Sequence, residues 1–197
     1  MGFAQKLPYY IQPEDYLLLE EKAEFKHEYL EGVIYDWQGA GPWGMAGGSI
    51  PHGRTILNTV VSLHRQLGKQ PCMLLSSEVR LHTADQSAYF YPDVVITCSA
   101  SDRSRNDAIS EPTLVVEVLS PSTEMFDRGD KFKVYRSFET LQTYVLISPE
   151  RRTIEVFSRA NNWLPIPGQQ QALRGTECLD LHALGLQLMA SDVFDPL

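Results

Sequence analysis

The strongest constraint on this chain is that two apolar, β-branched runs each contain a single carboxylate. The runs are Tyr91-Pro92-Asp93-Val94-Val95-Ile96 and Leu114-Val115-Val116-Glu117-Val118-Leu119-Ser120. Such runs are typical of buried strands. A carboxylate buried alone costs several kcal/mol, and two on neighbouring strands also repel each other. A divalent metal is the usual compensator, and paired strand carboxylates on a metal suggest phosphodiester hydrolysis.

The alternation of strand side chains decides which neighbours each carboxylate has. Asp93 shares a face with Val95, and Glu117 shares one with Val115. Both runs are apolar on both faces, which favours central strands. Two simpler explanations stay open: Asp93 follows Pro92 in a turn, and Glu117 pairs with a buried arginine. Taken together, the two carboxylates favour one shared cation, completed by a backbone carbonyl and water.

Composition and charge limit the class of protein. With 197 residues and 43% hydrophobic content, the chain can form one domain with a real core. The formal charge of −8 argues against a surface coated in positive charge for nucleic acid. Residues 1–40 hold eight acidic and three basic residues, and the other 157 hold 17 and 14. A local basic patch therefore remains possible in the larger part.

The cysteines and the apolar segments indicate the cellular compartment in which the protein is expected. Cys72, Cys98 and Cys178 are widely spaced, without the spacing of a metal site. Cys72 and Cys98 have apolar neighbours and are interpreted as buried, reduced thiols, which predicts a reducing, cytoplasmic environment. The N-terminus lacks the apolar stretch of a signal peptide, and no segment is long enough to cross a membrane, so we expect no membrane partner.

The order of elements predicts an α/β (α+β) fold, a mixed sheet with helices on its faces, in one domain over 1–197. An N-terminal helix and extended segments are expected at 13–38, the core at about 50–160, and a β extension at 161–197. Helices are expected at 52–67 and 124–138, with a loop at 99–111. Strands are expected at 73–82, 89–98, 114–119, 143–147 and 153–158.

A lysine on the second helix is the candidate cation. Lys131 shares a helical stripe with Val134, Tyr135 and Phe138, so its stem points at the sheet and its ammonium can reach the strand ends. A cation there can polarise a phosphate or position the attacking water. An ordinary pair with Asp127, four residues earlier, explains the lysine equally well.

Other polar residues carry less weight on their own. Glu28 lies in a charged run that would ordinarily face solvent, and His52 stands just before a helix, where it can simply cap or pack. Ser120 and Ser122 lack a histidine in a strand–turn–helix elbow, so serine hydrolase chemistry is not expected.

Four segments of the chain form a recognisable set of motifs. They are Lys26-His27-Glu28-Tyr29-Leu30-Glu31-Gly32, Met45-Ala46-Gly47-Gly48-Ser49 with His52, Tyr91-Pro92-Asp93-Val94, and Val116-Glu117-Val118-Leu119-Ser120-Pro121-Ser122-Thr123-Glu124 followed by Phe126-Asp127-Arg128-Gly129-Asp130-Lys131. Together they resemble the Uma-two family of restriction-endonuclease-like proteins. The resemblance covers roughly residues 14–159, and the last segment is the most specific.

That family is placed in the PD-(D/E)XK nuclease superfamily, so the resemblance implies a restriction-endonuclease-like core of αβββαβ type. It implies that Asp93 and Glu117 are metal ligands. It also implies that Glu28 and His52 line the same pocket.

The superfamily's lysine stands two residues after the glutamate, where this chain has Leu119. The resemblance therefore points to Lys131, brought from the following helix, as the substitute.

These expectations combine into a Mg²⁺- or Mn²⁺-dependent endonuclease that cuts DNA. Asp93 and Glu117 would hold the ion, with the carbonyl of Val118 as a third ligand. Lys131 would stabilise the developing charge or lower the pKa of the water. Arg103, Arg105 and Arg128 are the candidates for contacts to the nucleic-acid backbone, and a homodimer would let both strands be cut.

Two alternatives stay open. The first is a catalytically inactive module that binds nucleic acid or protein, favoured by the acidic charge and by Leu119 in the lysine position. The second is a metal phosphoesterase acting on RNA or a nucleotide. A steep fall of binding with salt would favour a polymer as ligand.

Overall fold

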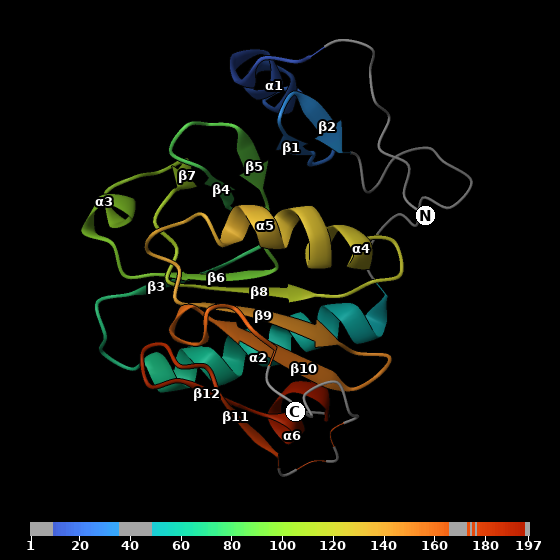
Figure 1. The fold of residues 1–197 in the computed structure, drawn as a ribbon, viewed down its shortest axis with the longest axis vertical. Helices are drawn as coiled ribbons and strands as arrows, with labels where there is room; N and C mark the ends of the chain where they lie inside the picture. Colours follow the sequence, from blue (N-terminus) through green and yellow to red (C-terminus); the bar gives the residue numbers. More distant parts are fainter. Residues whose placement is uncertain (1–9, 36–48, 166–172, 174, 176, 196–197) are drawn as a thin grey trace.

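A computed structural model describes residues 10–35, 49–165, 173, 175 and 177–195 (Figure 1). A mixed five-stranded sheet forms the centre, in the order β10-β9-β8-β6-β3. β8 and β9 are parallel, and the other neighbouring pairs are antiparallel. The bounds are β3 Met73–Ser76, β6 Val94–Thr97, β8 Leu114–Val118, β9 Thr143–Ser148 and β10 Thr153–Ser158.

A second five-stranded sheet, in the order β2-β1-β5-β4-β7, lies beyond the helices on one side of the first. Its strands are β1 Glu28–Leu30, β2 Val33–Tyr35, β4 Arg80–His82, β5 Ala88–Phe90 and β7 Ala108–Ile109. A hairpin of β11 (Cys178–Asp180) and β12 (Gln187–Met189) stands near the C-terminus. The helices are α1 Pro13–Glu20, α2 Ile50–Leu67, α3 Ala100–Arg103, α4 Glu124–Phe126, α5 Phe132–Tyr135 and α6 Ala190–Phe194, with a 3₁₀ turn at Arg159–Asn161.

Helices cover both faces of the central sheet, as the sequence predicts: α2 on one side, and α4 with α5 on the other (Figure 1). Ser49 caps α2 by accepting the N–H of His52. The apolar stripe of α2, including Leu63 and Leu67, packs on Val94 and Val116. The opposite face, with Val95 and Val115, packs under α4, α5 and the second sheet. Successive residues of β6 and β8 therefore pack on opposite faces of the sheet, as the strand pattern predicts.

Two expected strands are each divided between the sheets. Residues 73–82 form β3 and then β4, and residues 89–98 form β5 and then β6. Pro92 explains the second break, because proline has no N–H to continue a ladder. Asp93 therefore lies in the connection just before β6 and not inside a strand. The predicted loop at 99–111 is also incomplete, since it contains α3 and β7.

The expected helix at 124–138 exists, but its centre is widened. A π-helical turn, Asp127–Lys131, separates α4 from α5. Single π turns within helices are rare and often mark functional sites.

The cysteine prediction is wrong, because Cys72 and Cys98 form a disulfide. Met73 and Thr97 are the last opposed pair of the β3–β6 ladder. Cys72 comes just before Met73 and Cys98 just after Thr97, so the two cysteines are the next opposed positions. The inference of a reducing compartment loses its basis with them. Cys178 is free and exposed.

No helix among the described residues is long and apolar enough to span a bilayer. The motif residues 45–48 lie outside the described part of the chain.

Candidate active site

Backbone N–H groups on the two neighbouring segments hold the carboxylates of Asp93 and Glu117. Val94 stands opposite Val116 in the β6–β8 ladder, which makes Asp93 and Glu117 the next opposed positions. The backbone N–H of Asp93 donates to Oε2 of Glu117 at 3.2 Å. The backbone N–H of Val118 donates to Oδ2 of Asp93 at 2.7 Å. The end of the two strands therefore holds both carboxylates side by side.

Lys131 reaches these carboxylates from the π turn. Its Nζ lies 2.6 Å from Oε1 of Glu28, 3.1 Å from Oε1 of Glu117 and 3.4 Å from Oδ1 of Asp127. The sequence offered two explanations for Lys131, a cation at the strand ends and a pair with Asp127, and the structure shows both contacts. The pair with Asp127 is not on a helix surface, however, because both side chains are buried. The rings of Phe90 and Phe126 flank the ammonium.

Glu28 is buried, which contradicts the expectation of a solvated residue. β1 pairs with β5, and this pairing carries Glu28 to the start of the Tyr91–Asp93 connection. There its Oε1 accepts the N–H of Tyr91 at 3.2 Å. The geometry agrees with the resemblance, which assigned Glu28 to the same pocket as the two carboxylates.

His52 lies in the first turn of α2 and not before the helix. Its Nε2 is 2.8 Å from the carbonyl oxygen of Val118 and 3.8 Å from Oδ2 of Asp93. Because a carbonyl can only accept, Nε2 carries the proton in this hydrogen bond. The carbonyl has two lone pairs, so Val118 can accept from His52 and still face a cation.

Two tyrosines that the sequence analysis did not assign to the site contact this cluster. The hydroxyl of Tyr135 donates to Oε1 of Glu117 at 2.7 Å, and that of Tyr144 donates to the carbonyl of Asp127 at 2.9 Å. Tyr135 stands four residues after Lys131, one turn further along the same helix face. A tyrosine in an otherwise apolar stripe that also holds a buried lysine was the available sign.

The pKa values reflect a buried excess of negative charge. Burial raises the pKa of Asp93 to about 6, while His52 opposes the rise. Burial raises the pKa of Glu117 well above its usual range, against the influence of Lys131, and Asp127 raises it further. Burial alone would lower the pKa of Lys131, but the carboxylates around it hold that pKa well above its usual value.

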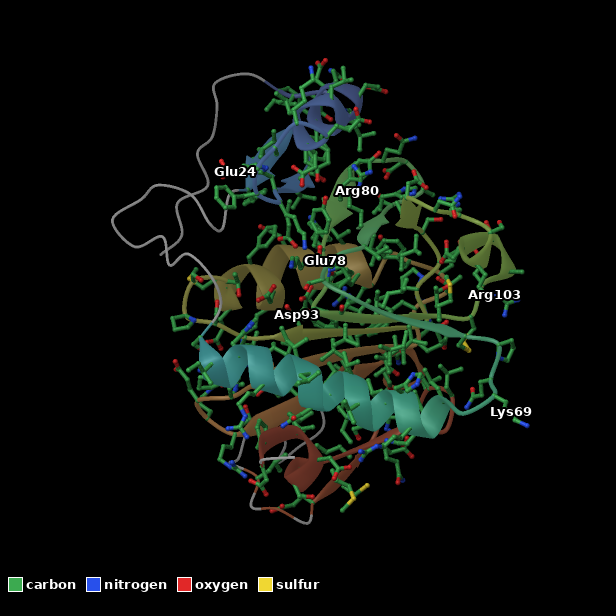
Figure 2. The ribbon with its side chains drawn as sticks, turned by 180° about the vertical axis from the view of Figure 1, so that it is seen from behind. Glu24, Lys69, Glu78, Arg80, Asp93 and Arg103 are labelled. Carbon is green, nitrogen blue, oxygen red and sulfur yellow. A yellow bond between two sulfur atoms is a disulfide. The ribbon has the colours of Figure 1, made fainter. Side chains whose placement is uncertain are left out.

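One ammonium thus contacts the carboxylates of Glu28, Glu117 and Asp127, and a fourth carboxylate, that of Asp93, lies next to Glu117. The side chains of Asp93 and His52 are 17% and 20% exposed, whereas those of Glu28, Glu117, Asp127 and Lys131 are at most 6% exposed. The cluster therefore meets solvent at Asp93 and His52, and Figure 2 shows Asp93 above α2 on this face.

The three arginines proposed to contact nucleic acid do not converge on the cluster. Arg103 donates to the carbonyl of Pro71, and Figure 2 shows it well separated from Asp93. Arg105 lies 3.1 Å from Nε2 of His82. Arg128 pairs with Glu124 and with the buried Glu155, so its guanidinium joins α4 to β10.

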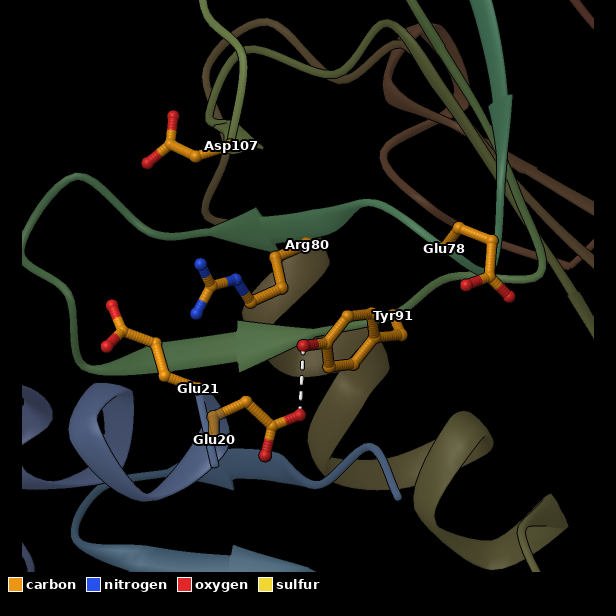
Figure 3. A pocket seen from close by; sticks show the side chains of 6 residues that line it. All are labelled: Glu20, Glu21, Glu78, Arg80, Tyr91 and Asp107. Carbon is orange, nitrogen blue, oxygen red and sulfur yellow. Dashed lines mark hydrogen bonds between the residues drawn. The ribbon is translucent and has the colours of Figure 1, made fainter. Parts of the chain in front are cut away.

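A pocket of about 240 Å³ lies near Tyr91 (Figure 3). It is lined by Tyr91, Arg80 and the acidic residues Glu20, Glu21, Glu78 and Asp107. Tyr91 connects it to the buried cluster, because its N–H binds Glu28 while its hydroxyl donates to Glu20 at 2.9 Å.

The donor set suits a hard cation. In the stretches that the structure describes, no three His, Cys, Asp or Glu side chains are arranged to bind one ion by themselves. Two carboxylates and a backbone carbonyl remain at Asp93, Glu117 and Val118. Mg²⁺ commonly takes one or two carboxylates and keeps several waters, so this oxygen set fits it.

Comparison with known proteins identifies the family. Residues 13–189 match the family model Uma2, whose description is "Putative restriction endonuclease". The chain belongs to the Uma2 family. The resemblance seen in the sequence motifs is thereby confirmed, and the Uma2 match extends it to nearly the whole described chain.

Relatives of this Uma2 chain include two proteins of Synechocystis, both named as uncharacterized. The protein slr1290 is 33% identical over 186 residues, covering 93% of this chain and 91% of its own length. The protein sll1609 is 32% identical over 154 residues, covering 76% and 82%. A solved structure from Anabaena variabilis, titled as a putative nuclease belonging to DUF820, has a TM-score of 0.61 at 20% identity and covers 93% of this chain and 97% of that one. At this identity the likeness concerns the fold, which is nuclease-like.

Proposed function

We propose that this protein is a metal-dependent endonuclease that hydrolyses phosphodiester bonds in DNA. The family and the fold support a nuclease. The observation that supports a metal ion is the buried charge. One lysine contacts three carboxylates, and a fourth, Asp93, meets Glu117 where β6 begins and β8 ends. A buried negative excess is costly unless it is protonated or neutralised by a cation.

Mg²⁺ or Mn²⁺ would be held by Asp93, Glu117 and the carbonyl of Val118. Such an ion supplies an activated water and neutralises charge that develops on the phosphate. Lys131 fixes one oxygen of Glu117 and offsets part of the surrounding negative charge. His52 holds the Val118 carbonyl at the exposed edge of the cluster, where a phosphate would enter.

The test is plasmid nicking with Mg²⁺ or Mn²⁺. The wild type should nick supercoiled DNA, and Glu117→Gln should not, although it keeps the same circular dichroism spectrum. Because restriction-type folds often work as dimers so that both strands are cut, we also propose a homodimer, which analytical ultracentrifugation would detect. If the wild type cleaves none of a varied set of DNA substrates, the proposed function is contradicted.

The second candidate is an inactive interaction module with the same fold. It is favoured by the charge of −8 and by the engagement of Arg103, Arg105 and Arg128 in contacts within the protein. Metal-dependent cleavage would exclude it. Cleavage of RNA but not DNA would instead point to a metal phosphoesterase with a different substrate.

A further inference from the structure

The two oxygens of Glu117 have different partners. Oε1 accepts the hydroxyl of Tyr135 at 2.7 Å and the ammonium of Lys131 at 3.1 Å. Oε2 accepts the backbone N–H of Asp93 at 3.2 Å. Oε1 is therefore directed toward the helix and the protein interior. Oε2 is directed toward Asp93, the side on which the cluster meets solvent.

The two donors to Oε1 do different work. Lys131 divides its charge among Glu28, Glu117 and Asp127, and any positive charge that it gives to Glu117 competes with a bound cation. Tyr135 is neutral, so its hydroxyl fixes the direction of the carboxylate without reducing its negative charge. The tyrosine is fully buried.

The ring of Tyr135 is held independently of its hydroxyl. It contacts the rings of Phe90, Phe138 and Tyr144, with centroid distances of 5.5, 6.4 and 5.2 Å. A phenylalanine at this position keeps those contacts. The hydroxyl can therefore be removed while the packing is preserved.

We propose that Tyr135 is a positioning residue that holds Oε1 of Glu117 and so presents Oε2, together with Asp93, to the catalytic metal ion. This inference rests on the proposed function and deepens it. Partners that orient a metal ligand are typically worth about 10–100-fold in metal affinity or activity.

The experiment compares Tyr135→Phe with Tyr29→Phe. Tyr29 is the matched control, because it is also fully buried and its hydroxyl donates at 2.7 Å, but to the carbonyl of Ile11 and away from the cluster. Mn²⁺ affinity is measured by electron paramagnetic resonance on each folded protein. The Mn²⁺ concentration for half-maximal cleavage and the KM for DNA are measured alongside.

Tyr135→Phe should weaken Mn²⁺ binding about 10–100-fold and raise the half-maximal Mn²⁺ concentration in parallel, with KM for DNA unchanged. Tyr29→Phe should match the wild type in all three. If Tyr135→Phe binds Mn²⁺ as tightly as the wild type, the hydroxyl is only structural and the inference is overturned, while the proposed function stands. If the wild type itself binds no Mn²⁺, the proposed function fails first and takes the inference with it.

Discussion

The ammonium of Lys131 lies 2.6 Å from Oε1 of Glu28, and this pair joins the π turn after α4 to strand β1 of the second sheet. The lysine is buried together with the carboxylates that surround it. Its removal therefore affects both the candidate chemistry and the stability of the protein.

Lys131→Ala should abolish most of the cleavage activity and also destabilise the protein by about 3–5 kcal/mol, because it leaves buried carboxylates without their cation. Urea unfolding and plasmid nicking measure the two effects. Lys133→Ala, which removes an exposed lysine from the same helix, is the control. A Lys131→Ala protein that is as stable as the wild type would contradict the buried ion cluster.

Stability should depend on pH through Asp93. Its pKa in the folded protein is about 6, above the ordinary value of 3.8, so the folded state binds the proton more tightly than the unfolded state does. The resulting stability is complete below the unfolded value and is lost as pH rises through about 6. Without metal, the free energy of unfolding should fall by on the order of 3 kcal/mol across this window. Asp93→Asn should flatten that part of the curve, as measured by urea titrations at several pH values.

Mg²⁺ or Mn²⁺ should raise the melting temperature of the wild type, because the ion binds the folded state alone. The rise should be larger above pH 6 than below it, since Asp93 must lose its proton to act as a ligand. Asp93→Asn should show no such rise. An equal rise in both proteins would place the ion elsewhere.

Alkylation under denaturing, non-reducing conditions should modify one cysteine, Cys178, and three after reduction. Removing the cross-link with Cys98→Ser should destabilise the protein by about 2–4 kcal/mol. Mn²⁺ affinity should not change, because neither Cys72 nor Cys98 contacts the charge cluster. Mass spectrometry that finds three reactive thiols without reduction would show that the bond does not form.

The sequence predicted correctly those features that depend only on neighbouring residues of one strand or one helix. A lone carboxylate in an apolar run identified Glu117, and strand alternation gave its face. The helical stripe placed Lys131 against the sheet. These predictions rest on periodicities that a strand or helix imposes on its own residues.

Non-local causes escaped the sequence. Nothing near Glu28 shows that β1 joins β5 and is buried, and nothing near Cys72 shows that its register partner is Cys98. The break at Pro92 was visible, but the apolar pattern continues on both sides of it, so the change of sheet was not. The sequence placed Tyr135 in the apolar stripe of the helix. The role of its hydroxyl could not be predicted until the structure showed Glu117 beside it.

The π turn at Asp127–Lys131 has a consequence for how relatives of this chain should be aligned. A π turn contains one residue more than an α-helix needs for the same path. Deleting one residue inside the turn, such as Gly129, would let the segment close as an ordinary α-helix, so the residues that follow would keep their direction. Deleting a residue elsewhere in the helix, where no extra one is present, would rotate everything that follows by about 100° around the helix axis and turn Tyr135 away from Glu117. A single-residue gap at 127–131 in an alignment should therefore mark a relative with a regular helix that still carries the cluster, whereas a gap just after Lys131 should mark one that has lost it.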